Sequence, residues 1–129
     1  MILLDTNVVS EPLRPAPETR VIEWIDAQPL ETLFLSAVTV AELRAGVALL
    51  PPGRRRSGLQ QNLEGRVLPL FAGRVLPFDL ACTQEYAALM AKARAAGLAI
   101  AAANGSAVAT RDAGLIKAAG AAVINPWHA

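Results

Sequence analysis

Five short apolar segments alternate with helical patterns along the chain, and this alternation constrains the fold more than any other feature of the sequence. The segments read ILLD, LFLSA, VLPF, AVAT and AVIN and occupy residues 2–5, 33–37, 75–78, 107–110 and 122–125. Continuous apolar strands separated by helices are typical of a parallel sheet that is buried on both faces. The sequence therefore predicts an α/β fold in three layers, with a central parallel sheet of about five strands and helices on both faces.

Helices are expected in the intervals between these strands, where apolar residues recur at helical spacing. The predicted helices and crossovers cover residues 17–28, 39–50, 59–70, 80–96 and 113–120. Asp79 and Gly97 flank the helix over 80–96, and these residue types are frequent N-caps and C-caps. The sequence PPGRRRSG at 51–58 predicts a turn that carries a basic cluster.

Length and composition fit a single domain over residues 1–129. A chain of 129 residues has room for one core. Its 53% hydrophobic and 18% charged residues favour a well-buried core over disorder. The formal net charge of +1 neither requires nor excludes a nucleic-acid partner, so local patches must decide that point.

The cellular setting follows from three further features. The start, MILLDTNVV, has no basic region and carries Asp5 within its apolar run, so it does not read as a signal peptide. No apolar run approaches the roughly 20 residues that a membrane helix needs. The single cysteine, Cys82, excludes an internal disulfide and reads as a small buried side chain in a reducing compartment. We expect a cytoplasmic protein with no membrane partner.

Four acidic residues lie just past the carboxyl ends of predicted strands: Asp5, Glu42, Asp79 and Asp112. The carboxyl ends of parallel strands share one edge of a sheet, and open α/β sheets bind their ligands there. Each acid also has a structural reading. Helix capping accounts for Asp79 and suits Asp5 and Asp112 about as well as a ligand role, while Glu42 fits a solvated position beside the core.

A cluster of three such acids would require a counter-charge. At about 5 Å and an effective dielectric near 20, each pair of carboxylates repels by ~3 kcal/mol, so three pairs approach ~10 kcal/mol. The whole stability of a small domain is roughly 5 to 15 kcal/mol. The cluster must therefore bind a cation or hold protons. All-oxygen ligands favour Mg²⁺ or Mn²⁺, which would position a phosphodiester, activate water and stabilise the leaving oxygen.

Five segments of the chain resemble one protein family. MILLDTNVVSEPLRP, LSAVTVAELRAGV, LPLFAGRVLPFD, VATRD and VINPWH are similar, in this order, to the PIN-domain ribonucleases. Within that family they resemble the VapC-type toxins of bacterial type II toxin-antitoxin modules, and among these the FitB-like branch. DTN or TRD alone would be a weak signal, whereas the combination along nearly the whole chain is specific. The resemblance implies a doubly wound parallel sheet and RNA cleavage that depends on Mg²⁺ or Mn²⁺.

The resemblance also assigns roles to individual residues. Three acids match the catalytic and metal-binding positions of the family: Asp5, Glu42 and Asp112. Three polar residues match positions that support this cluster: Thr6, Asn7 and Thr110. Members of the family usually form homodimers and are held inactive by a small antitoxin whose tail lies in the acidic groove. The resemblance therefore implies a cognate antitoxin, an RNA substrate, a homodimer and a toxin-antitoxin assembly on DNA.

The chain departs from the family pattern before the TRD motif. The family carries a further aspartate on a short helix, in a segment resembling IAAADGYIAA, whereas here IAAANG runs almost directly into SAVATRD. Either Asn104 replaces that acid and the following helix is lost, or acid and helix are both absent and ANG is a loop. The second alignment is favoured because ANGSAVATRD reads as a turn followed by a strand. The shortened stretch between about 101 and 107 reflects either a true deletion or about ten omitted residues.

Cationic residues bear on RNA binding, which requires neutralisation of phosphates. The one dense basic cluster is Arg54, Arg55 and Arg56, which reads as a solvated turn or as a contact for RNA or antitoxin. His128 beside Trp127 reads as a terminal anchor, because the expected chemistry needs carboxylates and no imidazole.

Three functions can be weighed against the sequence. The first is a metal-dependent endoribonuclease toxin. The second is a catalytically impaired PIN module that acts mainly as the antitoxin-binding part of a DNA-binding autoregulatory complex. The third, a receiver-like phosphorylation module, is disfavoured because Asp5 lacks a neighbouring acid and the last strand ends in Asn125 and Pro126 instead of a lysine.

Overall fold

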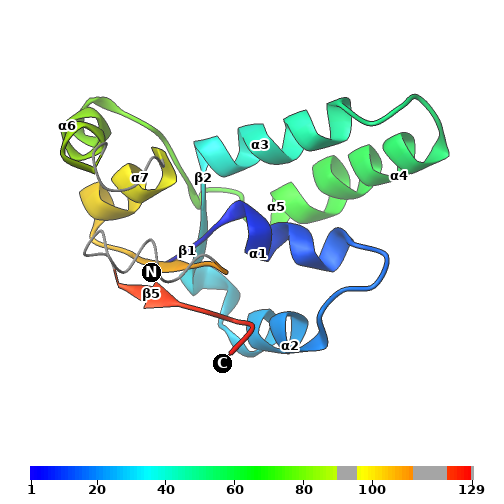
Figure 1. The fold of residues 1–129 in the computed structure, drawn as a ribbon, viewed down its shortest axis with the longest axis horizontal. Coiled ribbons are helices and arrows are strands. Elements are labelled where there is room, and N and C mark those ends of the chain that lie inside the picture. Colours follow the sequence, from blue (N-terminus) through cyan, green and yellow to red (C-terminus); the bar gives the residue numbers. More distant parts are fainter. Residues whose placement is uncertain (90–95, 112–121, 129) are drawn as a thin grey trace.

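The computed structural model describes residues 1–89, 96–111 and 122–128 and contains one five-stranded parallel sheet (Figure 1). The strands are β1 (Ile2–Leu4), β2 (Leu33–Ser36), β3 (Val75–Leu76), β4 (Ala107–Ala109) and β5 (Val123–Ile124). They lie in the order β3-β2-β1-β4-β5, and every neighbouring pair is parallel. The predicted α/β fold with a central parallel sheet is confirmed.

The strand order places β1 at the centre and creates a switch point beside it. The chain builds the sheet outward from β1 through β2 to β3, then returns to add β4 and β5 on the other side. In open α/β sheets, a crevice forms beyond the carboxyl ends of the two strands where the order reverses. These two strands are β1 and β4, which pair through Leu4 and Ala109. The topology thus predicts that a ligand site lies past these two residues.

Helices cover both faces of the sheet. The described helices are α1 (Thr6–Ser10), α2 (Thr19–Ala27), α3 (Ala37–Ala48), α4 (Arg54–Asn62), α5 (Leu68–Leu70), α6 (Leu80–Leu89) and α7 (Ala96–Asn104). Short 3-10 helices lie at Glu11–Leu13 and Leu30–Thr32, and a π-helical turn at Leu63–Val67 joins α4 to α5. Figure 1 shows α6 and α7 on one side of the strands and the other helices on the opposite side. No helix within the described ranges is long and apolar enough to cross a membrane.

The two faces of the sheet bury separate hydrophobic clusters. Side chains alternate along a strand, so consecutive residues of β1 face opposite sides. Leu4 joins a cluster with Val8 and Val21 of the α1 and α2 side. Leu3 joins a second cluster with Cys82 and other residues of the α6 and α7 side. Cys82 is fully buried, as its sequence context predicts. This division explains the three layers.

Two boundary predictions are wrong. The turn predicted over 51–58 is shorter, because α4 already begins at Arg54 and places the basic cluster on its first turn. Arginine is a good helix former, so the turn ends at Gly53, the N-cap of α4. Gly97 does not cap a helix but lies in the first turn of α7, whose alanine-rich continuation has high helix propensity. The predicted crossover over 113–120 lies outside the described residues.

The segment before β4 is a helix end followed by a tight turn. Gly105 follows α7 with φ of 62°, the left-handed conformation that favours glycine. Its N–H donates to the Ala102 carbonyl at 3.2 Å, and the Ser106 N–H donates to the Ala101 carbonyl at 3.0 Å. This pair of bonds defines a Schellman motif. The prediction that ANGSAVATRD contains a turn and then a strand is confirmed, with Asn104 as the last helical residue.

Candidate functional site

Asp5 lies at the switch point, directly after β1. Its N–H donates to the Ala109 carbonyl at 2.9 Å, which extends the pairing of β1 with β4 by one residue. The chain then turns into α1, and Asp5 Oδ1 accepts the Thr6 N–H at 2.8 Å. Burial of Val8 and Val9 holds α1 against the sheet. Asp5 is thus both the N-cap of α1 and a partly exposed carboxylate at the carboxyl edge of the sheet.

Two side chains hold the second oxygen of this carboxylate. The hydroxyl of Thr110, which follows β4, donates to Asp5 Oδ2 at 2.8 Å. Asn7 Nδ2 donates to the same oxygen and to Thr110 Oγ1, each at 3.3 Å. Thr110 has no exposed surface, whereas Asp5 and Asn7 are partly buried. The carboxylate orientation is therefore fixed by groups from two neighbouring strand ends.

Glu42 approaches the same edge from α3. Ser36 is the last residue of β2. Its hydroxyl caps α3 by accepting the Thr39 N–H at 3.0 Å. This cap sets the start of α3 and hence the position of Glu42, one turn further on. The Thr6 hydroxyl donates to Glu42 Oε2 at 3.1 Å. Thr6 therefore contacts both acids, Asp5 through its backbone and Glu42 through its side chain.

Three hydroxyl groups form a chain behind Glu42. Thr6 Oγ1 lies 3.3 Å from Thr39 Oγ1, which lies 3.2 Å from Ser36 Oγ. A hydroxyl has one proton, so when Thr6 donates to Glu42, the Thr39 hydroxyl is the donor in its contact with Thr6. Ser36 and Thr39 are buried, at 1% and 4% exposure. The exposed Glu42 carboxylate is thus anchored to a buried polar network.

The structure brings together five of the predicted site residues: Asp5, Thr6, Asn7, Glu42 and Thr110. The sixth, Asp112, lies outside the described residues. The described ranges contain two of the three expected acids and no group of three side chains with metal-ligating spacing. Asp79 is not part of the cluster. It caps α6 by accepting the Cys82 N–H at 3.2 Å, and its hydrogen bonds with Cys82 lower the pKa of Asp79.

Asn104 does not reach the cluster. It precedes β4, whereas Asp5 follows β1, and these strands are parallel, so the two residues lie at opposite edges of the sheet. The Asn104 side chain instead donates to the Ile100 carbonyl at 2.8 Å at the end of α7. Asn104 therefore ends α7 at the edge of the sheet opposite to Asp5.

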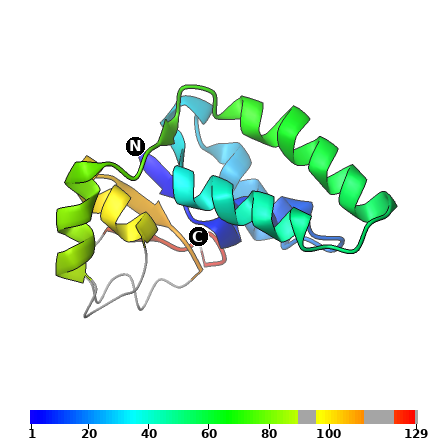
Figure 2. The same ribbon diagram turned by 90° about the horizontal axis from the view of Figure 1, so that it is seen from above.

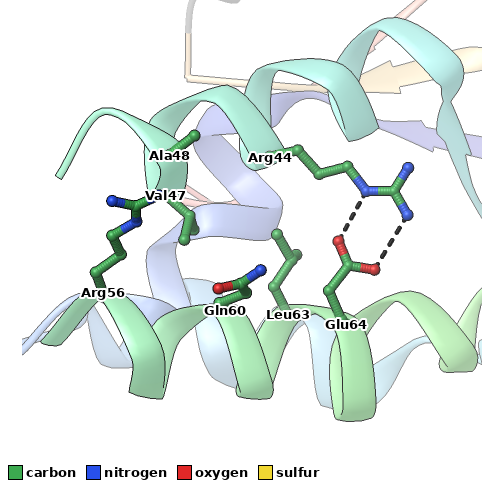
Figure 3. Close-up of a pocket in the computed structure, with 7 residues that line it drawn as sticks. All are labelled: Arg44, Val47, Ala48, Arg56, Gln60, Leu63 and Glu64. Carbon is green, nitrogen blue, oxygen red and sulfur yellow. Dashed lines mark hydrogen bonds and ion pairs between the residues drawn. The ribbon is translucent and has the colours of Figure 1, made fainter. Parts of the chain in front are cut away.

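The basic cluster also lies away from the acids, at the start of α4. Arg54 and Arg55 are exposed, and Arg56 lines a pocket of about 190 Å³ between α3 and α4 (Figure 3). Both views of the ribbon show these two helices side by side (Figures 1 and 2). Arg44 of α3 and Glu64 of the π-helical turn that follows α4 form a two-pronged ion pair, with distances of 2.8 and 3.0 Å. This pair lowers the pKa of Glu64 and raises that of Arg44.

Sequence reasoning missed Glu11, a buried acid near the site. Glu11 is only 3% exposed, and its carboxylate accepts from Arg14 Nη1 at 3.1 Å and from the Glu18 N–H at 3.0 Å. Burial acts to raise its pKa. Hydrogen bonds from Glu18 and Arg14, together with the charges of Arg14 and Arg111, outweigh this effect and lower the pKa of Glu11. The signal was the spacing of Glu11 and Arg14, an i,i+3 pair in SEPLR.

The chain is similar to several known proteins. The family model described as PIN domain matches residues 2–121. Over the full length of both proteins, the chain is 60% identical to the plasmid stability protein StbB of Pseudomonas syringae. It is also 53% identical to toxin FitB of Neisseria gonorrhoeae and to a VapC ribonuclease of Sinorhizobium fredii, each over 99% of both chains.

Solved structures share the fold. The crystal structure of FitAcB from Neisseria gonorrhoeae matches with a TM-score of 0.93 and 51% identity, covering 100% of both chains. A structure of FitAB bound to a DNA fragment matches with a TM-score of 0.92 and 50% identity, covering 100% of this chain and 97% of that one. VapBC from Rickettsia felis, bound to a promoter DNA fragment, matches with a TM-score of 0.74. At 18% identity, this third likeness concerns the fold alone.

Proposed function

This chain belongs to the PIN-domain family, and we propose that it is a metal-dependent endoribonuclease toxin of a type II toxin-antitoxin module. One observation carries the proposal. Thr6 joins Asp5 and Glu42, which come from different elements, at the crevice where the strand order reverses. The two carboxylates repel each other, so holding them close together does not stabilise the fold. Their arrangement is explained by a cation and an anionic substrate at this edge.

The donor set fits a hard divalent cation. Asp5 and Glu42 offer carboxylate oxygens, and Asn7 and the threonines add neutral oxygens but no sulfur or imidazole. Such ligands suit Mg²⁺ or Mn²⁺. We propose that Asp5, Glu42 and Asp112 hold the ion. When bound, it supplies Lewis-acid stabilisation of a phosphodiester and an activated water.

The remaining residues act by positioning. Thr110 and Asn7 fix the Asp5 carboxylate, and Thr6, backed by Thr39, fixes that of Glu42. Groups of this kind, hydrogen-bonded to metal ligands, typically change metal affinity or activity 10- to 100-fold when removed. Since Glu42 is exposed, the site is open to a polymer such as RNA. These features support cleavage of internal phosphodiester bonds.

The partners are proposed from the relatives. The similar FitAB structure is bound to a DNA fragment, and one relative is called a toxin. We infer that this chain is a single domain over residues 1–129, works in the cytoplasm as a homodimer, and is neutralised by a cognate antitoxin. The toxin-antitoxin pair would assemble on DNA.

A specific observation keeps the catalytically impaired module as a second candidate. The alignment with StbB spans 139 positions, 10 more than the chain has residues, so the relative has positions that this chain lacks. If these fall near residues 101–107, as the family pattern suggests, an acid is missing from the site. The chain would then bind its antitoxin but hold a cation weakly. Measurement of the intact mass would show whether the chain truly lacks these residues.

The test is RNA cleavage by the purified full chain with Mg²⁺ or Mn²⁺. We expect cleavage that EDTA abolishes and that Asp5→Asn reduces by at least 100-fold, while Asp79→Asn, a matched change outside the cluster, has little effect on cleavage. Cleavage that persists in EDTA or in Asp5→Asn would refute the proposal. No cleavage by the native chain, with antitoxin binding retained, would favour the impaired module.

A further inference from the structure

A polar pocket lies next to the acidic cluster, where β5 ends. Its volume is about 380 Å³, and it is lined by Glu18, Arg20, Arg111, Asn125, Trp127 and His128. Arg111 follows β4 and Asn125 follows β5, and these two strands are parallel neighbours. The pocket therefore occupies the same edge of the sheet as Asp5. Arg20 reaches it from α2, which lies beside the C-terminal end of the chain in Figure 1.

The wall of this pocket is a fixed turn. Asn125 Oδ1 accepts the Trp127 N–H, and the Asn125 carbonyl accepts the His128 N–H, each at 3.0 Å. Pro126, between them, is among the fully buried residues of the core. Trp127 packs partly against the hydrophobic cluster on the α1 and α2 side. The turn is thus anchored to the folded core.

Both arginines of the pocket are positioned by Trp127. The Arg111 guanidinium lies over the indole ring, 5.2 Å from its centroid. Arg20 Nη1 donates to the Trp127 carbonyl at 3.4 Å. Within the described ranges, neither guanidinium forms an ion pair. Two arginines and one acid, Glu18, line the pocket, which therefore carries a net positive charge.

Arg111 also connects the pocket to the acidic cluster. Its N–H donates to Asn7 Oδ1 at 3.2 Å, and Asn7 in turn contacts Asp5. A site built from carboxylates repels an RNA strand, whose every linkage carries a negative charge, so a cationic contact close by is needed to retain it. Arginine suits this role because its planar donors match phosphate oxygens. A stacked base fits less well, because Arg111 covers one face of the indole and the core contacts Trp127.

We propose that this pocket binds a backbone phosphate of the RNA strand beside the bond that is cleaved, with Arg20 and Arg111 as the phosphate ligands. The proposal rests on the ribonuclease function proposed above. The Asn125–His128 turn holds the two guanidinium groups in place, so that the strand enters the acidic cluster from the β5 side.

A binding experiment without cleavage tests the proposal. A fluorescent single-stranded RNA is titrated with the full chain carrying Asp5→Asn, in EDTA, over a range of salt concentrations. In this Asp5→Asn background, Arg20→Ala should weaken RNA binding roughly tenfold. It should also reduce the slope of log K against log salt by about 0.7, the value for one lost phosphate contact on a single strand. Arg20→Lys, which keeps the charge, should retain the slope. The matched control, Arg66→Ala, removes an exposed arginine of the π-helical turn and should change affinity less than twofold.

The outcomes separate this proposal from the one on which it rests. Equal effects of Arg20→Ala and Arg66→Ala, or none from either, would overturn the phosphate pocket. In the cleaving enzyme, Arg20→Ala should raise KM and leave kcat within about threefold, because the phosphate contact is made before and during the reaction alike. If the native chain does not cleave RNA but its RNA binding depends on Arg20, the phosphate-pocket proposal is supported and the ribonuclease proposal is refuted.

Discussion

The hydroxyl of Thr6 donates a hydrogen bond to Glu42 at 3.1 Å, across 36 positions of the sequence. The backbone N–H of the same threonine donates to Asp5. One small residue therefore sets the relation between two acids that approach the crevice from α1 and α3. The consequences of this relation can be measured separately from the fold, because the hydroxyl can be removed without changing the shape of the side chain.

Thr6→Val tests this relation. Valine keeps the side-chain shape but cannot donate to Glu42, so we expect kcat/KM and Mn²⁺ affinity to fall about 10- to 100-fold, the usual effect of losing a group that orients a metal ligand. Thr6→Ser keeps the hydroxyl and should stay within a few-fold of the native chain. Isothermal titration with Mn²⁺ and steady-state cleavage measure the two quantities. Equal metal affinity in the valine and serine variants would contradict the role given to the hydroxyl.

Thr110→Val addresses the buried partner of Asp5. Thr110 has no exposed surface and donates to Asp5 Oδ2 at 2.8 Å. Valine at this position removes that hydrogen bond from the Asp5 carboxylate. We expect the free energy of unfolding to fall by about 1 to 3 kcal/mol, with weaker metal binding. Urea denaturation followed by circular dichroism measures the stability. Thr32→Val, at a partly buried threonine remote from the acids, is the control. An equal loss of unfolding free energy in Thr32→Val would contradict the role given to Thr110.

Glu11 should make the stability of the fold dependent on pH. Its pKa is lowered below the ordinary value of 4.5, so the folded state holds the proton less tightly than the unfolded chain. The stabilisation is therefore complete above about pH 4.5 and is lost as the pH falls through the lower, folded-state pKa. Glu11→Gln should flatten the stability curve in this acidic window and cost about 1 to 3 kcal/mol at pH 7, because the hydrogen bonds from Arg14 and Glu18 are weakened.

Unfolding in urea at pH 7, 5, 4 and 3 checks this expectation. Glu23→Gln, at an exposed acid of α2, controls for the general effect of removing a negative charge. If the native chain and Glu11→Gln lose stability in parallel from pH 5 to pH 3, the linkage assigned to Glu11 is wrong.

Gly105 and Gly46 should respond in opposite directions to the same change. Gly105 has φ of 62°, so Gly105→Ala places a side chain in the left-handed region and should destabilise the fold by about 1 kcal/mol. Gly46 lies in the exposed part of α3 with open space where a Cβ would point, so Gly46→Ala should stabilise by about 0.5 to 1 kcal/mol. Thermal unfolding of both variants measures the difference. Destabilisation by both would mean that crowding, and not backbone conformation, governs these positions.

The sequence predicted much of the fold because its strands and helices carry local periodic patterns. The apolar run at 33–37 is long enough for a strand and too short for a buried helix, and β2 forms there. Asp79 was predicted as an N-cap, and its carboxylate accepts the Cys82 N–H. Helix boundaries were predicted less well. Gly97 lies inside α7, because the propensity of the residues that follow it outweighs a single local stop signal.

The sequence by itself determined that the acids follow strands, and hence that they gather at one edge of a parallel sheet. Only the tertiary structure decided which of them meet. Strand order depends on pairing between distant segments. The order β3-β2-β1-β4-β5 places Thr110 beside Asp5, 105 positions away, and leaves Asp79 beyond the outer strand β3. The chain of hydroxyls behind Glu42 and the buried Glu11 carboxylate were likewise set by packing, because hydrogen bonds between distant side chains leave no periodic trace in the sequence.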